Sequence, residues 1–107
     1  MDSRKIVLVD DEIDTGSTII EAVHLSKQYG AKDIFVACVH PVLSLNAAQR
    51  LSEAPIKELI TTNTIPIPQE AQTLFEDRLT ILPIAPMVAE VIRRANQGRS
   101  VGAMFNE

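Results

Sequence analysis

The stretch IVLVDDEIDTGSTI, residues 6–19, decides the fold of this sequence. Residues 5–9 form a short, largely apolar run, which is typical of a strand buried on both faces of a parallel sheet. Residues 10–16 are then expected to form a loop. Ser17 or Thr18 would cap the helix that follows, and Glu21 stands three residues beyond Thr18, as in a capping box. The order of strand, loop and helix predicts the first unit of an α/β fold.

The rest of the chain repeats this alternation. The first helix is expected to end at Gly30, and an apolar face at three- and four-residue spacing over residues 84–95 predicts an amphipathic last helix closed by Gly98. The other predicted elements are strands over 34–39, 58–62 and 79–82, a short helix over 46–53, and a polar loop over 67–77. Together they predict a mostly parallel, Rossmann-like sheet flanked by helices, which binds ligands outside the carboxyl ends of its strands.

The composition limits the kinds of partner. The chain has 107 residues, of which 46% are hydrophobic, so a single domain over residues 1–107 is expected. The formal net charge of −4 disfavours nucleic acid, whose phosphates need clustered Lys and Arg. No stretch approaches the roughly 18 apolar residues of a membrane span. Cys38 is the single cysteine, so an internal disulfide is excluded, a zinc site has no support, and a cytoplasmic location is expected.

The turn over residues 14–18 has the composition of an anion site. Gly16 allows a backbone path that a side chain would block, so successive N–H groups can converge at the start of the helix. Thr15, Ser17 and Thr18 add hydroxyl groups, and the helix dipole adds positive potential. The turn therefore predicts phosphate binding.

Asp10 and Asp11 stand immediately before this turn. Carboxylates would repel a phosphate unless they bind another part of the ligand. The vicinal hydroxyls of a sugar can donate to paired carboxylates, and a magnesium ion bridging those hydroxyls is a second arrangement. The combination predicts a sugar phosphate ligand. The alternative is an ordinary capped turn with solvated Asp side chains.

Three stretches of the sequence resemble a known family. VLVDDEIDTGSTI is similar to the ribose-phosphate signature of type I phosphoribosyltransferases. GAKDIFVACVHPVLSLNAAQRLSEAPIKELITTNTIP and LTILPIAPMVAEVIRRANQGRSVGAMF resemble, in order, the C-terminal part of ribose-phosphate pyrophosphokinases, or phosphoribosyl pyrophosphate synthetases. The resemblance covers nearly all of the chain and implies a partial phosphoribosyltransferase-type domain.

The resemblance implies transfer of diphosphate from Mg-ATP to ribose 5-phosphate. By position, Asp10 and Asp11 would meet the ribose hydroxyls, and the turn formed by Asp14, Thr15, Gly16, Ser17 and Thr18 would hold the 5-phosphate. Asp14 would accept a proton or orient water. Mg²⁺ would come with ATP and the ribose diol, with no direct protein ligand expected in this chain.

A regulatory site is also implied by the resemblance. Ser100 and Phe105 match residues that, in this family, help to bind ADP or inorganic phosphate between subunits of a homo-oligomer. Three positions depart from the family pattern: Ser17 replaces a second Gly, Glu12 replaces a hydrophobic residue, and Gly102 replaces a serine.

The parts of the family enzyme that act on ATP lie outside the matched stretches. These parts are the ATP-binding loop, the flexible loop with Lys and Arg, the pyrophosphate loop and a metal-binding His. We therefore expect the isolated chain to be inactive. The alternatives are a non-catalytic regulatory or binding module that associates with full-length synthetase subunits, and a small phosphoribosyltransferase acting on a base.

Other polar residues have more than one interpretation. His40 follows a predicted strand and would be either a near-site residue or a satisfied strand-end histidine. Residues 61–64 would either line the site or satisfy one another in a turn. His24 is expected to be partly buried on the first helix, and Cys38 is expected to be a buried, inert thiol.

Overall fold

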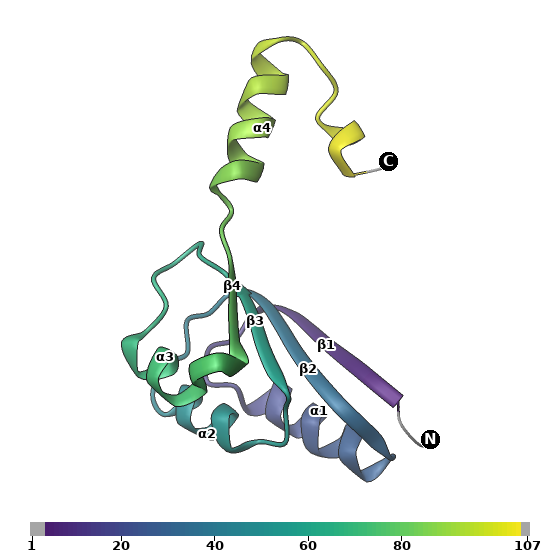
Figure 1. Cartoon of the computed structure of the whole chain (residues 1–107), viewed down its shortest axis with the longest axis vertical. Helices are drawn as coiled ribbons and strands as arrows, with labels where there is room; N and C mark the ends of the chain where they lie inside the picture. Colours follow the sequence, from purple (N-terminus) through teal and green to yellow (C-terminus); the bar gives the residue numbers. More distant parts are fainter. Residues whose placement is uncertain (1–3, 106–107) are drawn as a thin grey trace.

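The computed structural model describes residues 4–105, apart from the side chains of Met104 and Phe105. Strands and helices alternate along the chain, as the sequence predicts (Figure 1). The elements are β1 (Arg4–Glu12), α1 (Ser17–Gln28), β2 (Ala31–His40), α2 (Ala47–Glu53), β3 (Glu58–Thr62), α3 (Gln69–Phe75), the 3₁₀ turn η1 (Glu76–Arg78), β4 (Leu79–Leu82), α4 (Ala85–Asn96) and the 3₁₀ turn η2 (Gly102–Phe105).

The four strands form one parallel sheet in the order β1-β2-β3-β4. Because every crossover runs in the same direction along the sheet and crossovers are right-handed, the connecting helices fall on one face. Figure 1 shows α1, α2 and α3 together on that face. The prediction of an α/β fold with a parallel sheet is confirmed.

The hydrophobic core fills the space between the sheet and these three helices. Its central side chains come from every layer: Val23 of α1, Val36 of β2, Leu51 of α2, Leu59 of β3 and Phe75 of α3 are all essentially inaccessible to solvent. This packing holds the carboxyl ends of the strands in fixed positions relative to the starts of the helices.

The opposite face of the sheet is bare in the described part of the chain. Val7 and Val9 of β1 project there, and Val9 is 74% exposed. Val39 of β2 and Leu82 of β4 are also exposed. The prediction that the first strand is buried on both faces is therefore wrong, because helices cover only one face.

The first strand is longer than the predicted run of residues 5–9. Its ladder with β2 continues through the acidic residues, with Asp10 opposite Cys38 and Glu12 opposite His40. The predicted loop over residues 10–16 therefore begins only at Ile13. Hydrogen bonding to the neighbouring strand outweighs the low strand propensity of acidic side chains.

The start of α1 also differs from the prediction. Gly16 is the N-cap residue, with a left-handed φ of 82°, and no side chain caps the helix. The predicted caps, Ser17 and Thr18, lie inside the helix. The helix ends as predicted, since Gly30 adopts a φ of 92° just beyond it. His24 is exposed on α1 rather than partly buried.

The predicted loop over residues 67–77 is wrong, because this segment forms α3 and the start of η1. Ala71 and Phe75, four residues apart, lie on one side of α3 and are buried in the core. The polar residues between them face solvent. Ile67 and Leu74 also pack against the core, so the apolar residues of this segment do have the three- and four-residue spacing of a helix. The prediction missed this helix because the segment is short and its other residues are mostly polar.

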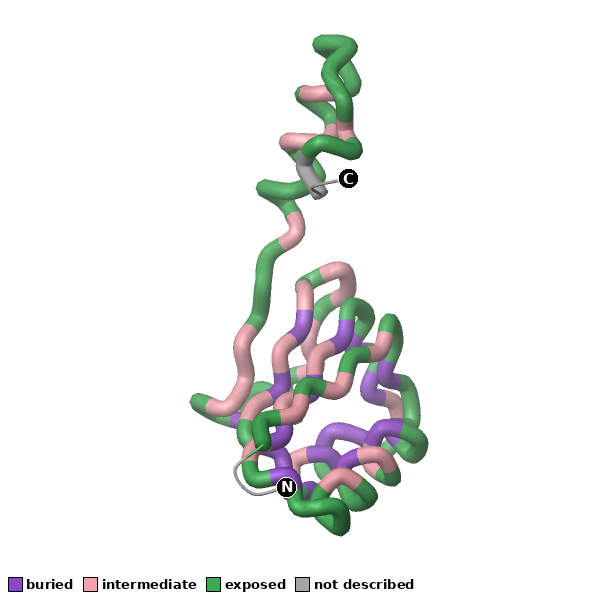
Figure 2. Tube along the Cα trace, turned by 90° about the vertical axis from the view of Figure 1, so that its right-hand side faces the viewer, coloured by how far each residue is buried: buried purple, intermediate pink, exposed green. Residues whose placement is uncertain are grey.

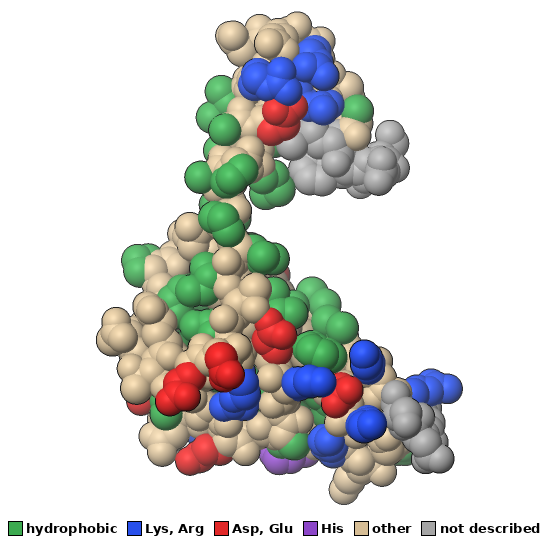
Figure 3. Space-filling model, in the orientation of Figure 1, with side chains coloured by type: hydrophobic (Ala, Val, Ile, Leu, Met, Phe, Trp, Pro, Cys, Tyr) green, Lys and Arg blue, Asp and Glu red, His purple; other side chains and the backbone are tan. Residues whose placement is uncertain are grey.

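Helix α4 is confirmed at its predicted position, but it packs on nothing within the described residues. It projects away from the sheet beyond β4 (Figures 1 and 2), and none of its residues is buried. The radius of gyration is 16.2 Å, against about 13 Å for a compact domain of 100 residues. Met87, Val88 and Ile92 form an exposed apolar stripe, and hydrophobic side chains continue from α4 onto the body below it (Figure 3).

Among the described residues, no helix combines the length and the hydrophobicity that crossing a membrane requires.

Candidate functional site

A cavity of about 190 Å³ lies at the carboxyl end of β1, where the chain passes into α1. Its lining runs along one continuous segment and consists of Asp10, Glu12, Ile13, Asp14, Thr15, Gly16, Ser17, Thr18 and Ile19. Pockets for drug-sized ligands measure about 300–1,000 Å³, so this cavity suits a smaller ligand or one end of a larger one.

The turn that lines the cavity carries a row of backbone N–H groups without hydrogen-bond acceptors in the described residues. Within residues 4–105, the N–H groups of Thr15, Gly16, Ser17 and Thr18 donate to no protein acceptor. Gly16, with its left-handed φ, is the N-cap residue of α1, so these N–H groups lie at the N-terminus of the helix. The first turn of α1 contains no acidic residue that would neutralise the helix dipole. This arrangement is suited to binding an anion with several oxygen atoms.

The segment after β2 fixes the loop from behind. Leu43 N–H donates to the carbonyl of Ile13 at 2.9 Å, and Ser44 N–H donates to the carbonyl of Asp14 at 2.9 Å. Ile13 N–H in turn donates to the carbonyl of His40 at 3.2 Å. Leu43 is buried with a φ of 49°, an uncommon conformation for a leucine. The cavity loop is therefore held in place by backbone contacts that do not involve its free N–H groups.

Leu45 offers a test of the strain in this segment. It has a φ of 56° and is 85% exposed, so it combines a left-handed backbone with little packing. We expect Leu45→Gly to raise the free energy of unfolding by about 0.5–1 kcal/mol, because glycine relieves the left-handed strain but loses more chain entropy on folding. Urea denaturation measures the change. Leu25→Gly, in the interior of α1, is the control and should lower stability by about 1 kcal/mol.

Asp10 and Asp11 are not brought together by the structure. Successive residues of a strand point to opposite faces, so Asp10 lines the cavity with Glu12, while Asp11 is absent from the lining. Asp14, two residues before Gly16, provides a third carboxylate in the cavity lining. Glu12 is thus a cavity residue that the sequence singled out only as a departure from the family pattern.

The cavity carboxylates fit a magnesium ion only in part. Oxygen ligands are those that Mg²⁺ prefers, and it is often held by one or two carboxylates together with waters and ligand phosphates. No group of three or more His, Cys, Asp or Glu side chains in the described residues is arranged to hold a metal ion. The described residues therefore form no metal site by themselves, and a magnesium ion that comes with ATP and the ribose diol stays a prediction.

One basic side chain reaches the loop from another element. Arg50 of α2 donates through Nη1 to the carbonyl of Thr15 at 3.3 Å, and both of its Nη atoms lie 3.5 Å from Ser17 Oγ. Arg50 stands more than 30 residues further along the chain from Ser17, and no sequence pattern links the two. Sequence reasoning missed this residue.

The polar residues after β3 satisfy one another. Thr62 Oγ1 donates to the carbonyl of Val39 at 2.6 Å, and Thr64 Oγ1 donates to the same carbonyl at 3.0 Å. The Thr64 hydroxyl also forms a hydrogen bond with Nδ1 of His40, over 2.8 Å. This contact holds the imidazole of His40 at the end of β2. Of the two interpretations of residues 61–64, these contacts fit a turn whose polar groups hydrogen-bond within the protein.

Cys38 is buried in β2, as predicted. Burial raises the pKa of its thiol; a hydrogen bond to Thr61 opposes this effect, and the negative charge of Asp10 adds to it. A thiol with a raised pKa that is inaccessible to solvent is a poor nucleophile, so Cys38 has a packing role.

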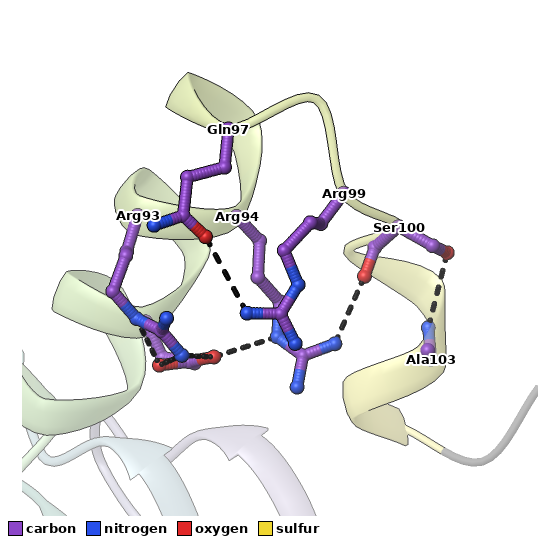
Figure 4. Close-up of polar contacts among 7 residues, drawn as sticks. Arg93, Arg94, Gln97, Arg99, Ser100 and Ala103 are labelled. Atoms are coloured by element: carbon purple, nitrogen blue, oxygen red, sulfur yellow. Dashed lines mark hydrogen bonds and ion pairs between the residues drawn. The ribbon is translucent and has the colours of Figure 1, made fainter.

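Ser100 lies far from the cavity, beside the end of α4 (Figure 4). Its carbonyl accepts from Arg94 Nη1 at 3.1 Å, and its hydroxyl accepts from Ala103 N–H at 3.3 Å. The side chain of Phe105 lies outside the described residues. A regulatory role for Ser100 and Phe105 stays a prediction.

Glu90 accepts from both Arg93 and Arg94, and these hydrogen bonds lower the pKa of Glu90 to about 2.

Comparisons with known proteins match the chain almost from end to end. The family described as the phosphoribosyl synthetase-associated domain matches residues 1–106. Ribose-phosphate pyrophosphokinase of Mycobacterium leprae is 42% identical over 99% of this chain and 32% of its own length. The Caldanaerobacter subterraneus subsp. tengcongensis enzyme of the same name is 41% identical over 95% of this chain and 31% of its own length.

A solved structure gives the same result. The crystal structure of phosphoribosylpyrophosphate synthetase from Mycobacterium smegmatis superposes with a TM-score of 0.80 and 43% identity. The match covers 91% of this chain and 32% of that chain. The chain therefore spans about a third of the length of the relatives that it matches.

Proposed function

Because the chain belongs to the phosphoribosyl synthetase-associated domain family, we propose that it is the ribose-5-phosphate-binding portion of a ribose-phosphate diphosphokinase. Such an enzyme transfers diphosphate from Mg-ATP to ribose 5-phosphate and makes phosphoribosyl pyrophosphate for nucleotide biosynthesis. In the proposal, the cavity at the end of β1 holds the sugar phosphate.

The observation that carries this proposal is the row of unpaired N–H groups from Thr15 to Thr18. A phosphate group can accept from several of these donors at once and adds its charge where the helix dipole favours an anion. The hydroxyls of Thr15, Ser17 and Thr18 supply further donors. The cavity carboxylates then face the sugar hydroxyls, which are donors themselves.

We propose that the 107-residue chain does not catalyse diphosphate transfer by itself. Transfer from ATP depends on cations that stabilise the charge of the phosphoryl groups. No Lys or Arg lines the cavity, and Arg50 is the basic side chain that hydrogen-bonds to its loop within residues 4–105. Release of AMP by the pure chain with Mg-ATP and ribose 5-phosphate would contradict this part of the proposal.

Titration with ribose 5-phosphate, followed by NMR, tests the binding proposal. We expect amide shifts concentrated in residues 10–19, and Asp10→Asn should weaken binding by about tenfold, since a charged hydrogen bond is worth about 1.5–3 kcal/mol. Asp11→Asn is the matched control. Because Asp11 is absent from the cavity lining, its substitution should change the affinity less than threefold.

Each outcome of this titration has a separate meaning. Shifts away from residues 10–19, or no shifts at millimolar ligand, would contradict the proposed site. An equal loss from both variants would show instead that the two carboxylates act as the pair that the sequence suggests.

A second candidate is a binding or regulatory module that associates with complete synthetase subunits or with further copies of itself. The observation in its favour is the pair of exposed apolar surfaces, the bare sheet face around Val9 and the stripe around Ile92 on α4. Several exposed apolar side chains gather on each surface, and such clusters mark sites of protein association more often than single exposed apolar residues do. Sedimentation of the chain, alone and mixed with a complete synthetase, tests this candidate, and Ile92→Glu should abolish any association through α4.

A further inference from the structure

We propose that Arg50 selects a dianionic phosphate as the ligand group bound at the start of α1. This inference rests on the proposed function, because it names a residue that gives the phosphate end of that site its specificity. The residue lies on α2, outside the acidic segment that lines the cavity.

The position of Arg50 is fixed by the packing of α2 against the loop. Ala47 and Leu51, on either side of Arg50 along the helix, are completely buried. A methyl group built on Gly16 would lie 3.7 Å from the side chain of Ala47, so the start of α2 lies close to the loop. Arg50 is partly buried at this contact and reaches both Thr15 and Ser17.

The contacts that Arg50 makes leave it able to bind a ligand. Its distances to Ser17 Oγ are both 3.5 Å, longer than the 2.7–3.2 Å of a strong N–H···O hydrogen bond. A guanidinium carries five N–H donors, and among the described residues only the two Nη atoms of Arg50 donate, over 3.3–3.5 Å. Ser17 itself lines the cavity, so a phosphate oxygen bound to Ser17 would lie next to the guanidinium.

The charge of the cavity favours a basic residue at the phosphate end of the site. Asp10, Glu12 and Asp14 all line it, and none of the basic residues in the described part of the chain does. A phosphate monoester near pH 7 carries a charge of about −1.5 to −2, so these carboxylates oppose it. The backbone N–H groups provide only partial charges, whereas Arg50 provides a full positive charge at the phosphate end. Charge-assisted contacts of this kind are about twice as strong as neutral ones.

The experiment compares Arg50→Gln and Arg50→Lys with the wild-type chain. Affinity for ribose 5-phosphate and for inorganic phosphate is measured by NMR titration at 20 mM and 300 mM NaCl. We expect Arg50→Gln to lower the affinity for both ligands about tenfold at 20 mM NaCl. Arg50→Lys should recover part of the affinity, because it keeps the charge and loses the two-pronged geometry. Arg93→Gln, on the exposed α4, is the matched control and should bind as the wild type does.

The salt dependence separates charge recognition from a structural role. Salt screens attraction between charges, so the wild-type affinity should fall as salt is raised. In Arg50→Gln the affinity should stay constant or rise as salt is raised, because the remaining cavity carboxylates repel the phosphate and salt screens that repulsion. Unchanged affinity in Arg50→Gln, or a loss with the wild-type salt dependence, would overturn the inference.

The two ligands keep this inference apart from the proposed function. If the wild-type chain binds inorganic phosphate but not ribose 5-phosphate, the proposed function fails, and the effect of Arg50→Gln on phosphate still decides the inference. If the wild-type chain binds neither, both fail.

Discussion

Replacing Phe75 with alanine is expected to lower the free energy of unfolding by about 3–5 kcal/mol. Phe75 is 1% exposed at the end of α3, and the guanidinium of Arg78 lies 5.1 Å from the centre of its ring. Truncation leaves a cavity between α3 and the sheet and removes the cation–π contact. Because small domains have a total stability of about 5–15 kcal/mol, this loss would remove a large fraction of the total.

Urea denaturation followed by circular dichroism measures this loss. Tyr29→Ala is the matched control, since Tyr29 is an aromatic residue that is 70% exposed, and it should change stability by less than about 1 kcal/mol. If Phe75→Ala cost no more than Tyr29→Ala, the packing of α3 into the core would be wrong.

The second large effect is expected at Gly16, where Gly16→Ala should weaken ribose 5-phosphate binding by about 5- to 30-fold. A left-handed conformation costs a residue with a side chain about 1–2 kcal/mol, and each 1.4 kcal/mol is a factor of ten in affinity. Space is not the obstacle, because a methyl group at Gly16 would meet its nearest neighbour, Ile20, at an ordinary 3.5 Å. The loop would relieve the strain by turning its N–H groups away from the cavity.

Gly98→Ala supplies the control for Gly16→Ala. Gly98 has a similar φ of 71°, with no atom within 4 Å of an added methyl group, but it lies beyond α4 and away from the cavity. We expect it to lower stability in urea by about 1 kcal/mol and to leave ligand binding unchanged. Equal binding by the Gly16→Ala and Gly98→Ala chains would contradict the role of the loop backbone.

The sequence predicts the elements whose residues follow a clear period. The apolar runs gave β3 and β4 at their observed bounds, and the spacing from Ile84 to Ala95 gave α4. The family signature placed the loop around Gly16. These features are local, because each depends on residues that are close together in the sequence.

The remaining features depend on contacts between distant segments. The extension of β1 through Glu12 needs β2 as its hydrogen-bonding partner, and α3 needs the core that buries Phe75. Likewise, Asp11 is separated from the cavity by strand geometry, and Arg50 reaches Ser17 through the packing of α2. The bare sheet face follows from the strand order, which no single stretch of sequence encodes.

That strand order has a consequence for how the chain folds. Each strand pairs with the one before it, so that Ile6 pairs with Ile34, Val36 with Leu59, and Leu59 with Leu79. These pairings close loops of only about 20–28 residues, and short closures keep the contact order low for a parallel sheet. During synthesis, every new strand would emerge beside a neighbour that is already in place. The sheet can therefore grow in one direction from β1, without waiting for a distant part of the chain.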